Sequence, residues 1–115
     1  PLDAMVLVPE ATFPGALIEC RAIGMFRMSD EMGADDKVLC IPVADQRQMD
    51  LKELTDLPNL TLLEIEHFFS VYKDLEPGKS VEGAVWVGHA DAEHEIKNSW
   101  ARAKGTSYEN EFTRD

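Results

Sequence analysis

The sequence contains few cysteines, few basic residues and no long apolar run, and each scarcity excludes a class of protein. Cys20 and Cys40 are the only cysteines, and neither has a second cysteine or a histidine at the spacing of a zinc site. No apolar run reaches the roughly 18–20 residues that a membrane-spanning helix needs, and a secretory leader is lacking. The sequence therefore predicts a cytoplasmic protein with reduced, buried thiols and no membrane partner. A disulfide between neighbouring strands is the alternative.

Lysine and arginine are scarce relative to the acidic residues. The chain has 11 basic and 22 acidic residues, which gives a formal net charge of −11. Nucleic-acid binding depends on basic side chains that replace phosphate counterions, so this balance argues against it. A small phosphorylated substrate remains compatible if divalent cations lie between the two anions. The simpler alternative is that the excess charge only keeps the protein soluble.

An initiator methionine is lacking too, because the chain opens on Pro1 within an apolar pattern. We therefore expect either a processed protein or a fragment of a longer one. The length of 115 residues and the apolar fraction of 44% suit one folded domain with a single core.

Hydrophobic patterning favours strands in the first half of the chain and helices in the second. Pro14 and Gly15 mark a turn, Gly24 interrupts a strand as a bulge would, and Gly105 can cap a final helix. Such an order of elements indicates an α+β domain. The expected strands are residues 4–8, 16–28, 38–41 and 80–87, and the expected helices are residues 60–75 and 90–104.

The helix expected over residues 60–75 carries two apolar stripes. A helix that is apolar on two sides usually packs twice, so the second stripe is either a subunit interface or more core. The broad stripe contains Leu62, Ile65, Phe68, Phe69, Tyr72 and Leu75, and the second contains Leu60, Leu63, His67 and Val71.

An acidic hairpin loop is the strongest chemical signal that the residues give by themselves. Asp30 and Asp35 flank Gly33, and Lys37 follows. Carboxylates at the two ends of one tight hairpin can converge on a hard cation such as Mg²⁺, and a nearby lysine can contact a phosphate. A solvated acidic loop with no ligand is the competing interpretation.

Four separated blocks in register resemble the soluble, magnesium-dependent, single-domain inorganic pyrophosphatases. They are PLDAM at residues 1–5, FPG at 13–15, MFRMSDEMGADDKVLC at 25–40 and HFFSVYKDLEPGK at 67–79. The resemblance covers residues 1–104, and the polar tail at 105–115 has no counterpart in it. It implies a small five-stranded β-barrel of the oligonucleotide-binding type with flanking helices, N-terminally incomplete here. It also implies a homo-oligomer, commonly a hexamer.

The resemblance further implies roles for individual residues in Mg²⁺-dependent hydrolysis of pyrophosphate to two phosphates by a metal-activated water. Asp3, Asp30 and Asp35 match metal ligands. The position of Asp35 is sometimes assigned as a proton acceptor, although the middle aspartate of the family signature is the more usual candidate. Lys37, Tyr72 and Lys73 match contacts to phosphate. The family signature D-x-D-P-x-D is represented only by its last three positions, Pro1 to Asp3, so two of its aspartates lie before the first residue.

Two other functions remain open at this point. The chain is expected either to be the enzyme, or to be a catalytically impaired truncated paralogue or fragment that serves as an assembly partner. A module that binds divalent cations without a substrate is the third hypothesis.

Overall fold

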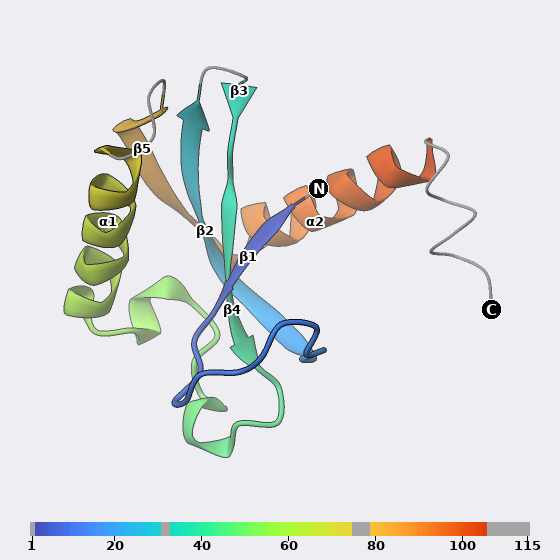
Figure 1. Ribbon diagram of the computed structural model, residues 1–115. Coiled ribbons are helices and arrows are strands. Elements are labelled where there is room, and N and C mark those ends of the chain that lie inside the picture. Colours follow the sequence, from blue (N-terminus) through green and yellow to red (C-terminus); the bar gives the residue numbers. More distant parts are fainter. Residues whose placement is uncertain (1, 31–32, 75–78, 106–115) are drawn as a thin grey trace.

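The computed structural model describes residues 2–30, 33–74 and 79–105. Within these ranges the chain forms a sheet flanked by two helices (Figure 1), so the expected α+β class is confirmed. The strands are β1 (Asp3–Val6), β2 (Cys20–Asp30), β3 (Gly33–Ala34), β4 (Lys37–Pro42) and β5 (Lys79–Gly88), and the helices are η1 (Gln46–Gln48), η2 (Leu54–Asp56), α1 (Asn59–Asp74) and α2 (His89–Lys104).

The long strand β2 organises the sheet. It pairs antiparallel with β4 and β3 and also antiparallel with β5, while β1 pairs parallel with β4. The Ser29–Ala34 pairing of β3 and the Phe26–Lys37 pairing of β4 follow one register, so β3 continues the line of β4 along β2. The register slips between Ala22 and Gly24, which confirms the irregularity predicted at this glycine.

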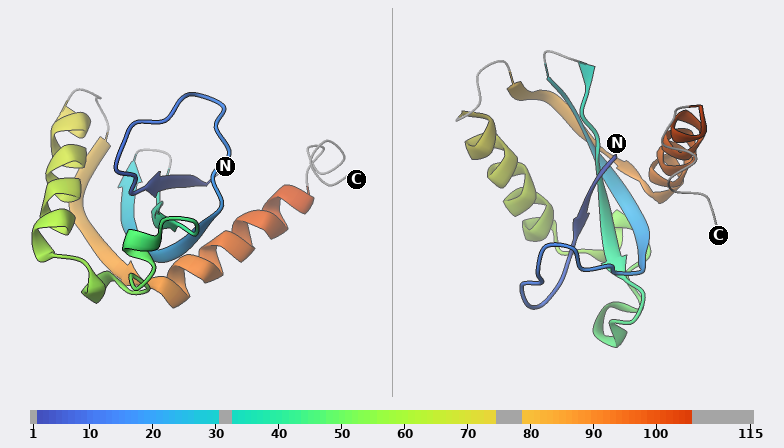
Figure 2. Two further views of the ribbon diagram at one scale, coloured as in Figure 1. Left: turned by 90° about the horizontal axis from the view of Figure 1, so that it is seen from below. Right: turned by 45° about the vertical axis from the view of Figure 1, so that its right-hand side comes forward.

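Alternation along the strands sends apolar side chains to both faces of the sheet. α1 and α2 lie on opposite sides of it (Figure 2), so each face obtains its own cover. On the α2 side the core contains Met25, Val38, Cys40 and Ala92. On the other side it contains Ile23, Leu39, Ile41, Phe26, Met28 and Phe69.

The expected barrel is not closed across the described residues. β1 lies at one end of the sheet and β5 pairs with β2, so the sheet remains open between β1 and β5. Five strands with two flanking helices agree with the expected class and strand number. The difference is one of closure, because the described chain supplies no strand that joins the two edges.

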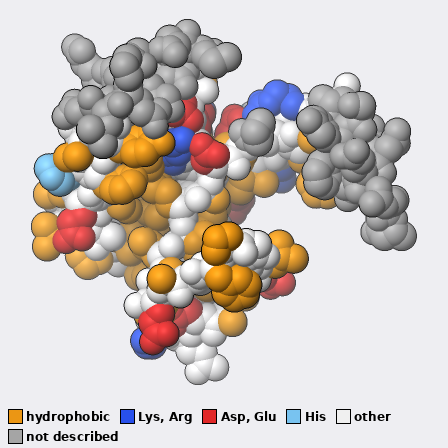
Figure 3. Space-filling view, viewed as in Figure 1, with side chains coloured by type: hydrophobic (Ala, Val, Ile, Leu, Met, Phe, Trp, Pro, Cys, Tyr) orange, Lys and Arg blue, Asp and Glu red, His pale blue; other side chains and the backbone are white. Residues whose placement is uncertain are grey.

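The apolar stripes of the helices are buried only in part. On α1, Phe69 is buried and Leu62 and Ile65 are half-buried, whereas the second stripe stays exposed. Figure 3 shows hydrophobic side chains spread over the side of the molecule that α1 forms. On α2, Ala92 is buried but Ile96 and Trp100 are exposed, because the C-terminal half of this helix extends away from the sheet (Figure 1).

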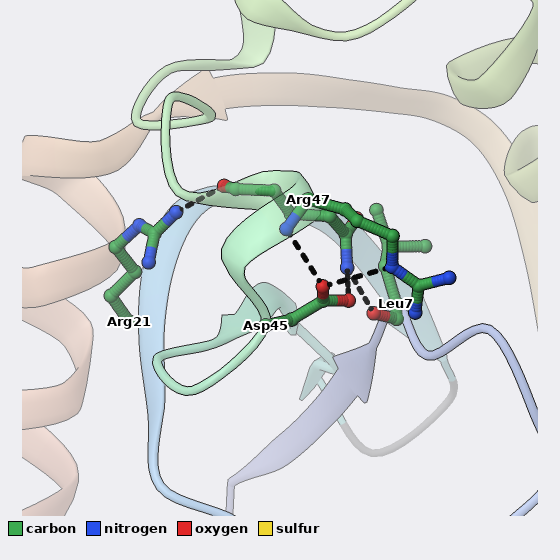
Figure 4. A network of polar contacts seen from close by, with 5 residues as sticks. Leu7, Arg21, Asp45 and Arg47 are labelled. Carbon is green, nitrogen blue, oxygen red and sulfur yellow. Dashed lines mark hydrogen bonds and ion pairs between the residues drawn. The ribbon is translucent and has the colours of Figure 1, made fainter.

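The segment between β4 and α1 is held to the sheet by polar contacts that surround η1 (Figure 4). The Gln48 side chain donates to the Leu7 carbonyl at 3.0 Å and to Asp45 at 2.9 Å. Arg21 on β2 donates to the backbone carbonyls of Gln48 and Leu51. These bonds tie the loop to β2 and to the residue that directly follows β1.

Cys20 and Cys40 are free thiols, as predicted, with Cys40 buried and Cys20 half-buried. The pKa of the Cys40 thiol is raised to about 11. Burial is the larger cause, and the neighbouring Cys20 is the smaller one. No helix in the described ranges is both long and apolar enough to cross a membrane.

Candidate active site

Several chain segments that carry predicted site residues meet at one end of the molecule. β1 and β4 start there, the β2–β3 hairpin turns there, and α1 ends nearby at the top of the view in Figure 1. The parallel pairing of β1 with β4 aligns Asp3 with Lys37, although 34 positions separate them in the chain. This end of the sheet is therefore where the predicted functional side chains can act together.

Lys37 bridges two of the predicted carboxylates. Its Nζ donates to Asp3 Oδ2 at 2.6 Å and to Asp35 Oδ1 at 2.8 Å. The Lys37 side chain is 12% exposed and that of Asp35 is 17% exposed, whereas Asp3 is 63% exposed. The three side chains therefore form a cluster with a dry inner side and an open outer side, which we call the rim cluster (Asp3, Asp35 and Lys37).

Two opposing influences act on the charge of Lys37. Burial alone would lower the pKa of its ammonium group, because the charged form loses hydration. The hydrogen bonds and charges of Asp3 and Asp35 outweigh burial, and the pKa of Lys37 is raised. The group therefore stays cationic at neutral pH and holds two carboxylates close together that would otherwise repel each other.

An aromatic ring lies on the inner side of the rim cluster. Lys37 Nζ is 6.0 Å from the centroid of the Phe69 ring, within the range of a cation–π contact. Phe69 is 8% exposed and comes from α1, which packs on this face of the sheet. The sequence placed Phe69 only on the apolar side of a helix. A contact between a helix and a strand far apart in the chain carries no local signal by which it could have been found.

Asp36 is not part of the rim cluster. Successive side chains of an extended segment point to opposite faces, so Asp35 and Lys37 share one face and Asp36 lies on the other. Burial is the main reason why the pKa of Asp36 is raised, and Glu95 of α2 adds to it while Arg27 opposes it. A cavity of about 360 Å³ borders both Asp36 and the rim cluster, and it is lined by Leu2, Asp3, Ala34, Asp35, Asp36, Glu95 and Arg102.

The remaining predicted residues, Asp30, Tyr72 and Lys73, lie at the same end of the molecule. Asp30 ends β2, where its backbone pairs with Gly33, and its side chain lies outside the described residues. Tyr72 lies in the last turns of α1, is 41% exposed, and stacks on Phe68 with ring centroids 6.1 Å apart. Lys73 follows it on α1, and its side chain also lies outside the description.

The donor chemistry of the rim cluster fits a hard divalent cation. Asp3 and Asp35 direct carboxylate oxygens at one point, which the Lys37 ammonium now occupies, and Mg²⁺ prefers such oxygen ligands. Among the described side chains, no three from His, Cys, Asp and Glu gather closely enough to hold a metal ion. The structure thus brings together two of the three predicted metal ligands.

The described chain is thus an α+β domain in which two carboxylates and a lysine gather at one end of the sheet. The family model for inorganic pyrophosphatase matches residues 1–104 of this chain. The chain therefore belongs to the inorganic pyrophosphatase family.

Individual relatives agree with this assignment. The chain is 61% identical over 104 residues to an inorganic pyrophosphatase of Streptomyces coelicolor, an alignment that covers 90% of this chain and 64% of the relative. Among solved structures, the pyrophosphatase of Thermus thermophilus is 35% identical with a TM-score of 0.80, covering 90% of this chain and 61% of that one. The Coxiella burnetii pyrophosphatase is 41% identical with a TM-score of 0.78, covering 89% and 62%.

The chain thus spans less than two thirds of the length of these relatives. The fold, the order of the blocks and the rim cluster all lie within the shared part.

Proposed function

We propose that this protein hydrolyses inorganic pyrophosphate to two phosphates with the help of Mg²⁺. The observation that carries the proposal is the rim cluster, in which Lys37 joins Asp3 and Asp35 at 2.6 and 2.8 Å in a chain of the pyrophosphatase family. Such a cluster offers carboxylates for cations and an ammonium group for phosphate at one place.

Asp3, Asp30 and Asp35 are the residues that we expect to hold Mg²⁺. Asp3 and Asp35 already direct oxygens at a shared point, and Asp30 lies at the end of the strand beside them. When bound, the ion neutralises charge on pyrophosphate and acidifies water that it contacts. We assign Asp35 as the residue that also accepts a proton, since it is a carboxylate that is largely shielded from solvent.

Lys37, Tyr72 and Lys73 are proposed to contact phosphate. Lys37 holds its charge in a partly dry position, where a fixed cation interacts more strongly with an anion than it does in bulk water. Tyr72 presents its ring at the surface on the last turns of α1, and a phenolic hydroxyl can donate to a phosphate oxygen. These groups would orient pyrophosphate and stabilise the charge that builds up on the departing phosphate.

The assembly and location of the protein are also proposals. The exposed stripe on α1 that contains Leu60, Leu63, His67 and Val71 is a surface that a second copy can cover, which supports a homo-oligomer and, by family resemblance, a hexamer. Free thiols and the acidic composition are compatible with a cytoplasmic protein.

The test is phosphate release from pyrophosphate in the presence of Mg²⁺. We would compare this chain with a chimera that adds the part of the Streptomyces coelicolor relative that the alignment leaves unmatched. Asp35→Asn in the chimera should reduce kcat by about 10²–10³, the usual effect of losing one preorganised polar group. Asp50→Asn, an exposed loop aspartate, is the matched control and should leave kcat unchanged. A folded chimera without activity would disprove the proposal.

A further inference from the structure

Four aromatic side chains form a continuous series from the core to the exposed end of α1. Phe26 on β2 stacks on Phe69 with ring centroids 6.0 Å apart. Phe69 meets the edge of Phe68 at 5.1 Å with an interplanar angle of 79°, and Phe68 stacks on Tyr72 at 6.1 Å and 16°. Phe69 is the buried member between the core ring and the two exposed rings.

Phe69 also touches the rim cluster. Lys37 Nζ lies 6.0 Å from the centroid of its ring, while the same ammonium group donates to Asp3 and Asp35. One buried ring thus contacts Lys37 directly and reaches Tyr72 through Phe68. These two residues come from different elements, β4 and α1, and both are assigned to phosphate in the proposed function.

We propose that Phe69 is a positioning residue that fixes Lys37 and Tyr72 relative to each other for binding of pyrophosphate. This inference rests on the proposed function for the role of these two residues. Lysine has a flexible four-carbon stem, so an ammonium group that must meet a phosphate at a fixed point gains from a contact that limits its motion. The face of an aromatic ring provides such a contact through its negative electrostatic potential.

If Phe69 only filled space in the core, another apolar side chain could replace it. Leucine could fill much of the same space in the core and would keep the hydrophobic contacts with Phe26 and Met28. It would offer neither a ring face to Lys37 nor an edge contact to Phe68. The comparison of Phe69→Leu with Phe69→Tyr therefore separates positioning from packing, because tyrosine retains the ring.

The first measurement is spectroscopic and requires no substrate. In the NMR spectrum of this chain, the Hε protons of Lys37 should resonate upfield of those of the exposed Lys52 and Lys97, because the Phe69 ring shields them. Phe69→Tyr should keep this shift and Phe69→Leu should remove it. Ile65→Val, on the same helix and in the same core, is the control for destabilisation and should keep it. The wild-type comparison alone remains decisive if Phe69→Leu does not fold.

The second measurement is kinetic and uses the chimera defined above. Phe69→Leu should raise KM for pyrophosphate about two- to tenfold, the range expected for one cation–π contact. kcat should change less, because contacts made in both ground and transition states affect mainly KM. Phe69→Tyr should restore the wild-type KM, and Ile65→Val should leave it unchanged.

The outcomes separate the two proposals. An unshifted Lys37 signal in the wild-type chain, or an unchanged KM in a folded Phe69→Leu variant, overturns the positioning role while the hydrolytic function stands. A wild-type chimera without hydrolysis overturns the proposed function, and the Lys37 signal then decides alone whether Phe69 positions this ammonium group.

Discussion

Asp3 and Lys37 are partners in the parallel pairing of β1 with β4, and their side chains are joined by an ion pair of 2.6 Å. The backbone register alone brings the two residues opposite each other, so the pairing of two strands creates half of the rim cluster. The other half is local, because Asp35 lies only two positions before Lys37. Stability and site geometry therefore depend on the same contacts, which makes them testable together.

Replacing Lys37 with methionine should destabilise the protein by about 1–3 kcal/mol, because Asp3 and Asp35 lose the cation between them. Urea unfolding at neutral pH measures this change. Mg²⁺ should restore more stability to the variant than it adds to the wild type, since no ammonium group competes for the carboxylates. Lys97→Met, which removes an exposed lysine of α2, is the control. Equal stability of both variants would contradict the bridging role of Lys37.

Mg²⁺ should raise the thermal stability of the wild-type chain through the same carboxylates. A ligand that binds only the folded state adds about 2.7 kcal/mol at one hundred times its Kd. Asp35→Asn should lose most of this gain because one ligand charge is removed, whereas Asp50→Asn should keep it. Thermal unfolding monitored by circular dichroism over a series of Mg²⁺ concentrations tests the prediction. An equal gain in Asp35→Asn would show that the ion binds elsewhere.

Gly24→Ala should destabilise the protein by about 1–3 kcal/mol through overpacking. A Cβ atom at Gly24 would overlap the side chain of Leu54, the first residue of η2. The cross-strand partner Gly88, which is the N-cap of α2, is the matched control, because a Cβ there meets no atom within 4 Å and the expected cost is below about 1 kcal/mol. Unfolding free energies of Gly24→Ala, Leu54→Ala and the double variant should show that the two costs do not add.

His89 and Glu53 should make stability depend on pH near neutrality. The Glu53 carboxylate accepts from His89 Nδ1 and raises the pKa of this histidine above its ordinary value of 6.5. A raised pKa stabilises the folded state fully below 6.5, and the contribution is lost as the pH rises through the folded-state pKa. Urea unfolding from pH 5.5 to 8.5 in low salt measures this loss. His89→Gln should flatten the dependence, whereas His94→Gln, on the same helix, should not. An identical slope in both variants would contradict the assignment.

The strands and helices could be predicted well because their signals are local. Helix α1 was expected at residues 60–75 and occupies Asn59–Asp74, and the bulge at Gly24 follows from a glycine within an apolar strand. The strand expected from residue 16 begins only at Cys20, because the turn around Gly15 occupies the chain before it. The open sheet could not be predicted, since strand pairing depends on contacts between distant segments.

The candidate site was predicted in its residue types more than in its contacts. Motif blocks identified Asp3, Asp35 and Lys37, and the structure brings these three together. The motifs gave no reason to expect that Lys37 would lie over Phe69, or that Asp36 would face Glu95 on the other side of the sheet. Both relationships arise from the packing of helices on opposite faces, which no short stretch of sequence encodes.

The parallel pairing of β1 with β4 also has a consequence for the order in which the protein folds and opens. β2, β4 and the β3 hairpin are close in sequence and can form early, whereas β1 must close a loop of more than thirty residues before it gains any bond to β4. Since β1 has only four residues and sits at an edge of the sheet, its amide hydrogens should exchange earlier than those of β2 and β4. Detachment of β1 would carry Asp3 away from Lys37 while the rest of the sheet persists. Bound Mg²⁺ should therefore slow the exchange of the β1 amides more than that of the amides in β2 and β4.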